Sequence, residues 1–178
     1  MDDGPDDSPA EPRFVADAML GRLARWLRLL GWDVLYDPSL DDRELARLAA
    51  REGRILLSRD RGLLARRIVR QGLFVRDDDV GLQLAQVLRD LELRPDPSRA
   101  WTRCSVCNTP TEAVPKPSVE GRVPAYTFAT HDRFRRCPGC GKIYWAGTHR
   151  ALACADLARW LGKTPSPGCG GEDPQKVP

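Results

Sequence analysis

The sequence predicts an α/β fold with a mostly parallel central sheet, followed by a small cysteine-bearing module. Over residues 13–93, short apolar segments alternate with segments whose apolar residues recur every three or four positions. These spacings are typical of buried strands and of amphipathic helices, respectively. Farther along the chain, four of the six cysteines form two C-x-x-C pairs. Strands that alternate with helices favour a parallel sheet covered by helices on both faces.

Four strand–helix units are expected in order along the α/β part of the chain. Strands are predicted at residues 13–16, 33–36, 54–58 and 73–76. Helices are predicted on the apolar residues within 19–30, 45–49, 63–68 and 82–91, and the first three are expected to end at Gly31, Gly53 and Gly72. The second helix begins at a pair of acidic residues, so either Asp41 or Asp42 is expected to be its N-cap.

Composition divides the chain into a body and two tails. Residues 1–12 hold five acidic residues and no basic one, and residues 163–178 are rich in Pro and Gly, so both tails are expected to be disordered. Pro95 and Pro97 break the strand–helix pattern and mark a boundary. The expected parts are therefore an α/β domain at 13–97, a zinc ribbon at 98–148 and a closing helix at 149–162.

The body of the protein is more basic than the whole chain. Residues 13–162 hold 26 basic and 18 acidic residues, and 24 of the 28 basic residues of the chain are Arg. Arginine binds phosphate through two parallel hydrogen bonds, which favours a nucleic-acid ligand, although a GC-rich genome would enrich Arg equally well. Neither a membrane-spanning segment nor a signal peptide is recognisable, so a cytoplasmic protein with reduced thiols is expected.

Two C-x-x-C pairs predict a structural zinc site. Cys104 and Cys107 form the first pair, and Cys137 and Cys140 form the second, followed by Gly141. Four thiolates complete a tetrahedral Zn²⁺ site and leave no open position for catalysis, whereas a redox C-x-x-C would need only one pair. Short strands of the module are expected within 123–128 and 143–145.

Basic and aromatic residues alternate in this module, which suits single-stranded nucleic acid unless the aromatic side chains form the module's own core. The arginines expected to contact phosphates are Arg22, Arg25, Arg28, Arg59 and Arg61 in the α/β domain and Arg133, Arg135 and Arg136 in the ribbon.

Carboxylates follow every predicted strand. They are Asp17, Asp37, Asp60 and the aspartates at 77–79, and Asp42 and Glu44 add two more in the first turn of the second helix. The carboxyl ends of parallel strands share one edge of the sheet, where ligands bind. Carboxylates gathered there repel one another unless a cation such as Mg²⁺ or Mn²⁺ neutralises them. Each aspartate taken singly is equally well explained as a helix N-cap.

Three segments carry a resemblance to a known family. ADAMLGRLARWLRLLGWDVLYD, DDRELARLAAREGRILLSRDRGLLARR and RFRRCPGCGKIYWAGTH, together with the first C-x-x-C pair, resemble the Mut-seven C-terminal RNase domain family over about residues 13–162. The resemblance implies a PIN-like three-layer α/β/α nuclease domain with an appended zinc ribbon. It also implies acidic residues that hold a metal for RNA hydrolysis.

By position, the resemblance implies that Asp17, Asp42 (or Glu44) and Asp60 are the catalytic carboxylates, with Asp77 or Asp78 as a fourth. The family often has Ser-His-Trp after the ribbon, whereas this chain has Thr-His-Arg at 148–150, which leaves the role of His149 open. The expected function is a Mg²⁺- or Mn²⁺-dependent ribonuclease acting on single-stranded RNA. The alternatives are a non-catalytic RNA-binding or ribosome-associated protein and a small-molecule phosphatase.

Overall fold

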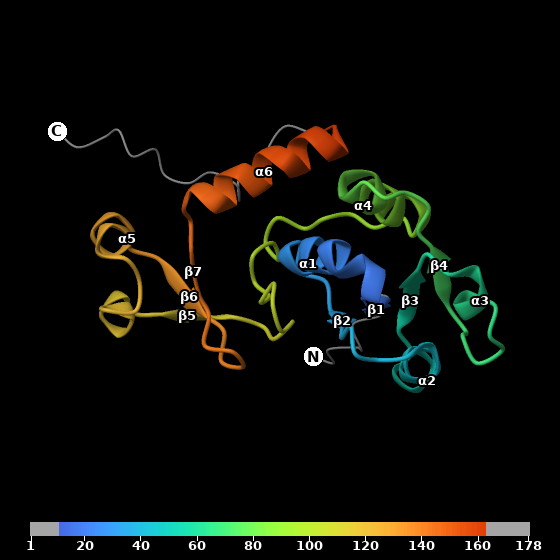
Figure 1. The fold of residues 1–178 in the computed structure, drawn as a ribbon. Coiled ribbons are helices and arrows are strands. Elements are labelled where there is room, and N and C mark those ends of the chain that lie inside the picture. Colours follow the sequence, from blue (N-terminus) through green and yellow to red (C-terminus); the bar gives the residue numbers. More distant parts are fainter. Residues whose placement is uncertain (1–10, 163–178) are drawn as a thin grey trace, which may run out of the picture.

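The computed structural model describes residues 11–162, which form two sheets and the helices around them (Figure 1). The larger sheet contains β1 (Phe14–Ala16), β2 (Val34–Tyr36), β3 (Ile55–Ser58) and β4 (Gly72–Phe74) in the order β2-β1-β3-β4. Every neighbouring pair in it is parallel. The predicted α/β class and its four parallel strands are therefore confirmed, each strand within two residues of its expected bounds.

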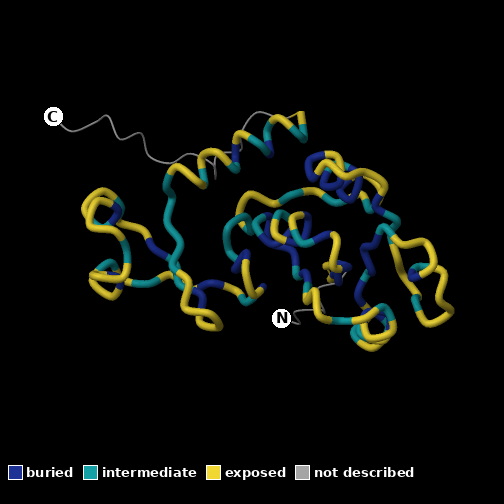
Figure 2. The backbone as a smooth tube through the Cα atoms, viewed as in Figure 1, coloured by how far each residue is buried: buried dark blue, intermediate teal, exposed yellow. Residues whose placement is uncertain are grey.

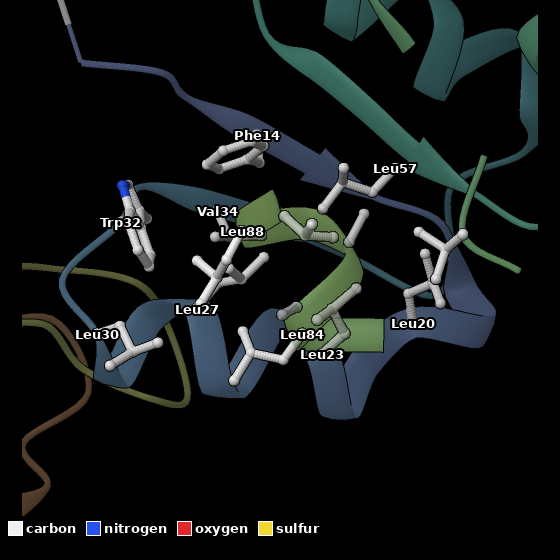
Figure 3. Close-up of a cluster of buried hydrophobic side chains, with 14 of the residues drawn as sticks. Phe14, Leu20, Leu23, Leu27, Leu30, Trp32, Val34, Leu57, Leu84 and Leu88 are labelled. Carbon is white, nitrogen blue, oxygen red and sulfur yellow. The ribbon is translucent and has the colours of Figure 1, made fainter. Parts of the chain in front are cut away.

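Alternate side chains of the strands divide the core into two halves. Phe14 and Ala16 of β1 pack with η1 (Ala18–Leu20), α1 (Gly21–Leu29) and α4 (Val80–Asp90) on one face of the sheet (Figure 3). Val15, between them, packs on the other face with α2 (Asp42–Glu52) and α3 (Arg61–Leu64). Since successive strand residues point to opposite faces, helices must cover both faces, and the three-layer architecture follows.

Helix α2 has strong signals at both ends. Asp41 is its N-cap and forms a capping box with Glu44, and Gly53 ends it with a left-handed φ of 62°. The N-cap is thus Asp41 rather than Asp42. The capping box fixes the first turn of α2, which carries Asp42 towards the carboxyl edge of the sheet.

The prediction for the third helix was wrong in length. Helix α3 ends at Leu64, and Ile68, which was expected on its apolar face, is 45% exposed. Gly72 begins β4 instead of ending a helix. After Leu64 the chain reads Ala-Arg-Arg, so no further apolar residue in helical register is buried to extend α3.

The cysteine module forms a second, antiparallel sheet. It contains β5 (Glu112–Val114), β6 (Phe134–Arg136) and β7 (Ile143–Trp145) in that order, with η2 (Lys116–Val119) and α5 (Ala125–Thr130) between β5 and β6. The strand expected within 123–128 is wrong, since that segment enters α5. Its N-cap is Pro124. Proline cannot donate an N–H to a neighbouring strand, whereas at the start of a helix that N–H has no partner to lose.

Helix α6 (Thr148–Leu161) closes the fold and confirms the last predicted helix within one residue at each end. It runs from the end of β7 to α4 (Figure 1). It packs against that helix through Leu157 and Trp160. His149, in its first turn, is exposed. Figure 2 shows that buried residues concentrate in the parallel sheet and its helices, whereas η2 and α5 are largely exposed.

The two predicted disordered tails lie outside the described residues, except for residues 11 and 12. Within the part that is described, no helix has both the length and the apolar character needed to cross a membrane.

Candidate functional site

The four C-x-x-C cysteines come together at one point. All four Sγ atoms lie within 4.8 Å of one another, with Cys104 and Cys137 buried and Cys107 and Cys140 exposed. The Sγ–Sγ distance is 3.6 Å between Cys104 and Cys140. Tetrahedral Zn²⁺ with bonds of about 2.3 Å would separate its sulfurs by roughly 3.8 Å. The cluster therefore fits a metal such as zinc, as the spacing predicted.

Backbone amides support this sulfur cluster. The N–H of Cys107 donates to Cys104 Sγ at 3.5 Å, and the N–H of Cys140 donates to Cys137 Sγ at 3.4 Å. Tyr144 Oη lies 3.0 Å from Cys104 Sγ. Hydrogen bonds to sulfur stabilise the thiolate form and orient it towards a metal, so these groups complete the outer shell of the site.

Cys107 has marked thiolate character. Burial opposes ionisation there, but hydrogen bonds with Thr109 and the neighbouring thiols outweigh it, and the pKa of Cys107 falls to about 6. A thiol of this kind binds a metal ion at neutral pH with little proton competition.

One arginine attaches this module to the α/β domain. Arg28 of α1 donates from Nε to the Val34 carbonyl at 2.9 Å. Its Nη1 donates to the Val106 carbonyl at 2.7 Å and to the Ser105 carbonyl at 3.4 Å, both within the first C-x-x-C turn. Arg28 is only 4% exposed. The expectation that it contacts RNA phosphates is therefore wrong, because its hydrogen-bond donors bind the module instead.

An asparagine makes the second attachment. The Asn108 side chain accepts from the Val34 N–H at 3.1 Å and donates to Asp33 Oδ1 at 2.9 Å. Arg54 Nη1 donates to the same Asp33 oxygen at 2.6 Å. Burial alone would raise the pKa of Asp33, but the hydrogen bonds from Arg54 and Asn108 outweigh it and lower that pKa. This network was not predicted from the sequence. Its only signal there is an Asn, a residue that tolerates the positive φ of 70° found at this position, directly after a cysteine.

At the carboxyl edge of the parallel sheet, one serine links two of the predicted catalytic aspartates. Ser58 Oγ donates to Asp17 Oδ2 at 2.7 Å and accepts from the Asp60 N–H at 2.9 Å. Asp17 is 9% exposed and Ser58 is fully buried. Ser58 Oγ thus connects the carboxyl ends of β1 and β3 by hydrogen bonds and orients the Asp17 carboxylate. Asp60 was predicted as a site residue, whereas no role was predicted for Ser58, two residues before it.

Four of the aspartates at this edge are part of helix or loop caps, and they are Asp37, Asp60, Asp77 and Asp79. Asp60 Oδ1 accepts from the N–H groups of Gly62 and Leu63 at 2.6 and 3.2 Å, which begins α3. Asp77 Oδ1 accepts from the Asp79 N–H at 3.0 Å. Each cap uses one carboxylate oxygen and fixes the side chain beside the edge.

The two candidates on α2 differ in their contacts. Glu44 Oε2 accepts from the Asp41 N–H at 2.9 Å, so Glu44 belongs to the capping box. Asp42 Oδ2 forms an ion pair with Arg66 at 3.2 Å. Among residues 11–162, the four cysteines are the only group of three or more acidic, His or Cys side chains close enough to share one ion. The structure thus connects the Asp17 carboxylate with the Asp60 backbone through Ser58, and it does not bring Asp42 into one group with them.

The predicted RNA-contacting arginines fall into two groups. Arg59 forms an ion pair with Asp78, and Arg135 donates from Nε to Thr111 Oγ1 at 2.8 Å. Arg136 is half-buried in β6. The exposed members of the set are Arg22, Arg25, Arg61 and Arg133. The exposed arginines are therefore free to move towards a phosphate, whereas Arg59 and Arg135 would have to exchange an existing partner.

Comparison with known proteins agrees with this arrangement. No curated protein and no solved structure matches the chain. The family described as the Mut7-C RNAse domain matches residues 12–155, which include the parallel sheet, its carboxyl edge and all four clustered cysteines. Because this match spans most of the sequence, the chain belongs to the Mut7-C RNAse domain family.

Proposed function

We propose that this protein is a metal-dependent ribonuclease that hydrolyses phosphodiester bonds of RNA at the carboxyl edge of its parallel sheet. Membership in a family of RNase domains indicates a nuclease-type function. The observation that carries the finer proposal is the hydrogen-bonded link from Asp17 through Ser58 to Asp60. Ser58 orients the buried Asp17 carboxylate and also holds the backbone of Asp60, which follows the neighbouring strand end, so the two acidic side chains are candidates for one cation site.

The chemistry of these donors fits Mg²⁺ or Mn²⁺. Within the described part of the chain, Asp17 Oδ1 and Asp60 Oδ2 accept no hydrogen bond, so each residue keeps a free oxygen for an ion. Hard oxygen donors of this kind are the ligands that these cations prefer. When bound, such a cation lowers the pKa of a water molecule and stabilises charge on the phosphoryl group.

Asp42 is proposed as the third carboxylate, with Glu44 or Asp77 in support. Its present partner is Arg66, and the side chains of this pair are 49% and 41% exposed, respectively. An exposed ion pair contributes only about 0–1 kcal/mol, so a bound cation could replace Arg66 at little cost.

The chain's own residues would also place the RNA. Ser58 keeps the Asp17 carboxylate from rotating, and the exposed guanidinium groups of Arg22 and Arg25 on α1 are available to phosphates. The ribbon, folded by zinc, would add the exposed guanidinium of Arg133 as a further phosphate contact. Phosphate contacts made by arginines would give binding that weakens steeply as salt is added.

The test is cleavage of an end-labelled single-stranded RNA and of its DNA counterpart. The zinc-loaded protein is assayed with Mn²⁺, with Mg²⁺ and with EDTA, beside Asp17→Asn, Asp60→Asn and the control Asp96→Asn. Asp96 caps its own loop by accepting from Ser98, away from the sheet edge. Asparagine is as good an N-cap as aspartate, so Asp60→Asn removes the charge and keeps α3.

Metal-dependent cutting that disappears in the two edge variants and persists in Asp96→Asn is expected. Cutting that persists in Asp17→Asn would point to a contaminating enzyme and would contradict the proposal.

A second function, non-catalytic RNA binding, is favoured by one observation. Several of the acidic residues at the edge act as helix or loop caps, and no third carboxylate of the described residues joins Asp17 and Asp60. RNA binding with a steep salt dependence and without cleavage in any metal would support this alternative.

A further inference from the structure

A pocket of about 400 Å³ opens beside the carboxyl edge of the parallel sheet. Its lining residues are Met19, Arg59, Asp60, Arg61 and Phe74. They come from η1, from the start of α3 and from the end of β4, three elements that begin or end at this edge. The pocket is shallow and largely open to solvent, so a ligand there would lie on a surface of side chains and would not be enclosed.

The side chains in this pocket form a flat apolar and cationic surface. The Arg61 guanidinium carbon lies 4.1 Å from the centroid of the Phe74 ring, which is a stacked cation–π pair. In the register of the β3–β4 pair, Phe74 lies directly beside Ser58, the serine whose side chain contacts Asp17 and Asp60. Met19, two residues after Asp17, is 67% exposed. An exposed, flexible thioether beside a stacked aromatic ring can adapt to a planar ligand.

The chemistry of the lining favours one kind of ligand. Aromatic rings and guanidinium planes bind nucleobases by stacking, and the cation also attracts the adjoining phosphate. Asp60 already uses one carboxylate oxygen to cap α3, and Arg59 is paired with Asp78. Recognition would therefore depend on stacking more than on hydrogen bonds to base edges, and stacking tolerates all four bases.

We propose that this pocket holds one unpaired nucleobase of the RNA, next to the phosphodiester that reaches the Asp17 and Asp60 carboxylates. The proposal rests on the ribonuclease function only in that RNA passes this edge. A base in a duplex is stacked and paired, and unstacking it costs a few kcal/mol. The substrate is therefore RNA that is single-stranded at this position.

The experiment is a double-mutant cycle on binding, with the full-length zinc-loaded protein and without added Mg²⁺ or Mn²⁺. The probe is a short fluorescent single-stranded oligoribonucleotide, compared with versions that lack the base at one position in turn. Loss of the stacked base should weaken wild-type binding roughly 5- to 150-fold at one or two positions.

In Phe74→Leu, binding of the intact RNA should weaken by a similar factor, and loss of the base at those positions should have no further effect. Met19→Ala is a second variant whose exposed side chain does not support the fold, and it should reduce the effect of base loss in the same way.

Phe128→Leu is the matched control, because the Phe128 ring also forms a cation–π pair but lies in the ribbon. Its partner is Lys116, whose Nζ is 5.2 Å from the ring centroid. It should leave the effect of base loss as large as in the wild type. If base loss weakens wild type and Phe74→Leu equally, or has no effect on wild-type binding, the subsite does not exist. Cleavage is not read in this cycle, so a failure of the ribonuclease proposal would appear separately, as absent metal-dependent cutting with the cycle intact.

Discussion

Replacement of Arg28 by methionine is expected to loosen the attachment of the cysteine module to the α/β domain. The guanidinium of Arg28 donates to the Val34 carbonyl at 2.9 Å and to the Val106 carbonyl at 2.7 Å. A longer bond of 3.4 Å reaches the Ser105 carbonyl. Methionine retains much of the apolar stem of the side chain but can make none of these bonds.

The magnitude follows from the two short bonds. A hydrogen bond from a charged donor contributes about 1.5–3 kcal/mol, so losing two of them costs about 4 kcal/mol. Burial lowers the pKa of Arg28 because a charge in a buried position is unfavourable, so removal of that charge returns part of the cost. The expected net loss of unfolding free energy is about 2–3 kcal/mol, or roughly 4–12 °C in Tm.

Urea unfolding followed by tryptophan fluorescence measures this loss, and a chromophoric chelator measures the rate of zinc release. Arg25→Met is the control, since Arg25 is exposed on the same helix and should change stability by less than about 0.5 kcal/mol. Release of zinc should accelerate in Arg28→Met, because the first C-x-x-C turn loses its support. Equal stabilities of Arg28→Met and Arg25→Met would refute the assignment of Arg28 as the attachment.

Three further outcomes are expected. Cys137→Ser should abolish stoichiometric zinc binding, measured by elemental analysis, because three thiolates leave the tetrahedral site incomplete; retention of the full zinc content would contradict the assignment. Burial would raise the folded-state pKa of Asp33, but hydrogen bonds from Arg54 and Asn108 outweigh it, so this pKa is lowered. The contribution of Asp33 to stability is therefore present above its unfolded pKa of about 3.9, and it is lost as pH falls through the folded pKa. Acid unfolding should therefore reduce the stability of the wild type more steeply than that of Asp33→Asn, and parallel curves would argue against the network. Asp41→Ala should cost about 1 kcal/mol in urea unfolding by removing the capping box of α2, whereas Asp41→Ser should stay within a few tenths of the wild type.

Local sequence signals were sufficient for most elements of the fold. The strands could be recognised because each is a short apolar segment bounded by charged or turn-forming residues, and β1 and β3 are almost wholly buried. Helix α2 could be recognised because Asp41 and Gly53 mark its ends. The helix expected beyond Leu64 failed because Ile68 suggested an apolar face that the fold leaves exposed.

The metal cluster and the carboxyl edge differ in how far the sequence could predict them. A C-x-x-C turn brings two sulfurs together by local geometry, so two such turns within one small module predict a shared ion. Carboxylates at the ends of different strands depend on strand order and on the loops that follow. The order β2-β1-β3-β4 places Asp17 next to Ser58, and no spacing along the chain indicates that contact.

By itself, then, the sequence determined the α/β class, the parallel strands, the four cysteines and the family, because these depend on periodicity and on short spacings. Only the tertiary structure decided which arginines are used internally, that Ser58 joins Asp17 to Asp60, and that Arg61 stacks on Phe74 beside them. The physical reason is that a side chain finds its partner through space. Arg28 and Val106 are separated by 78 positions along the chain, yet they form one of the hydrogen bonds that attach the cysteine module to the α/β domain.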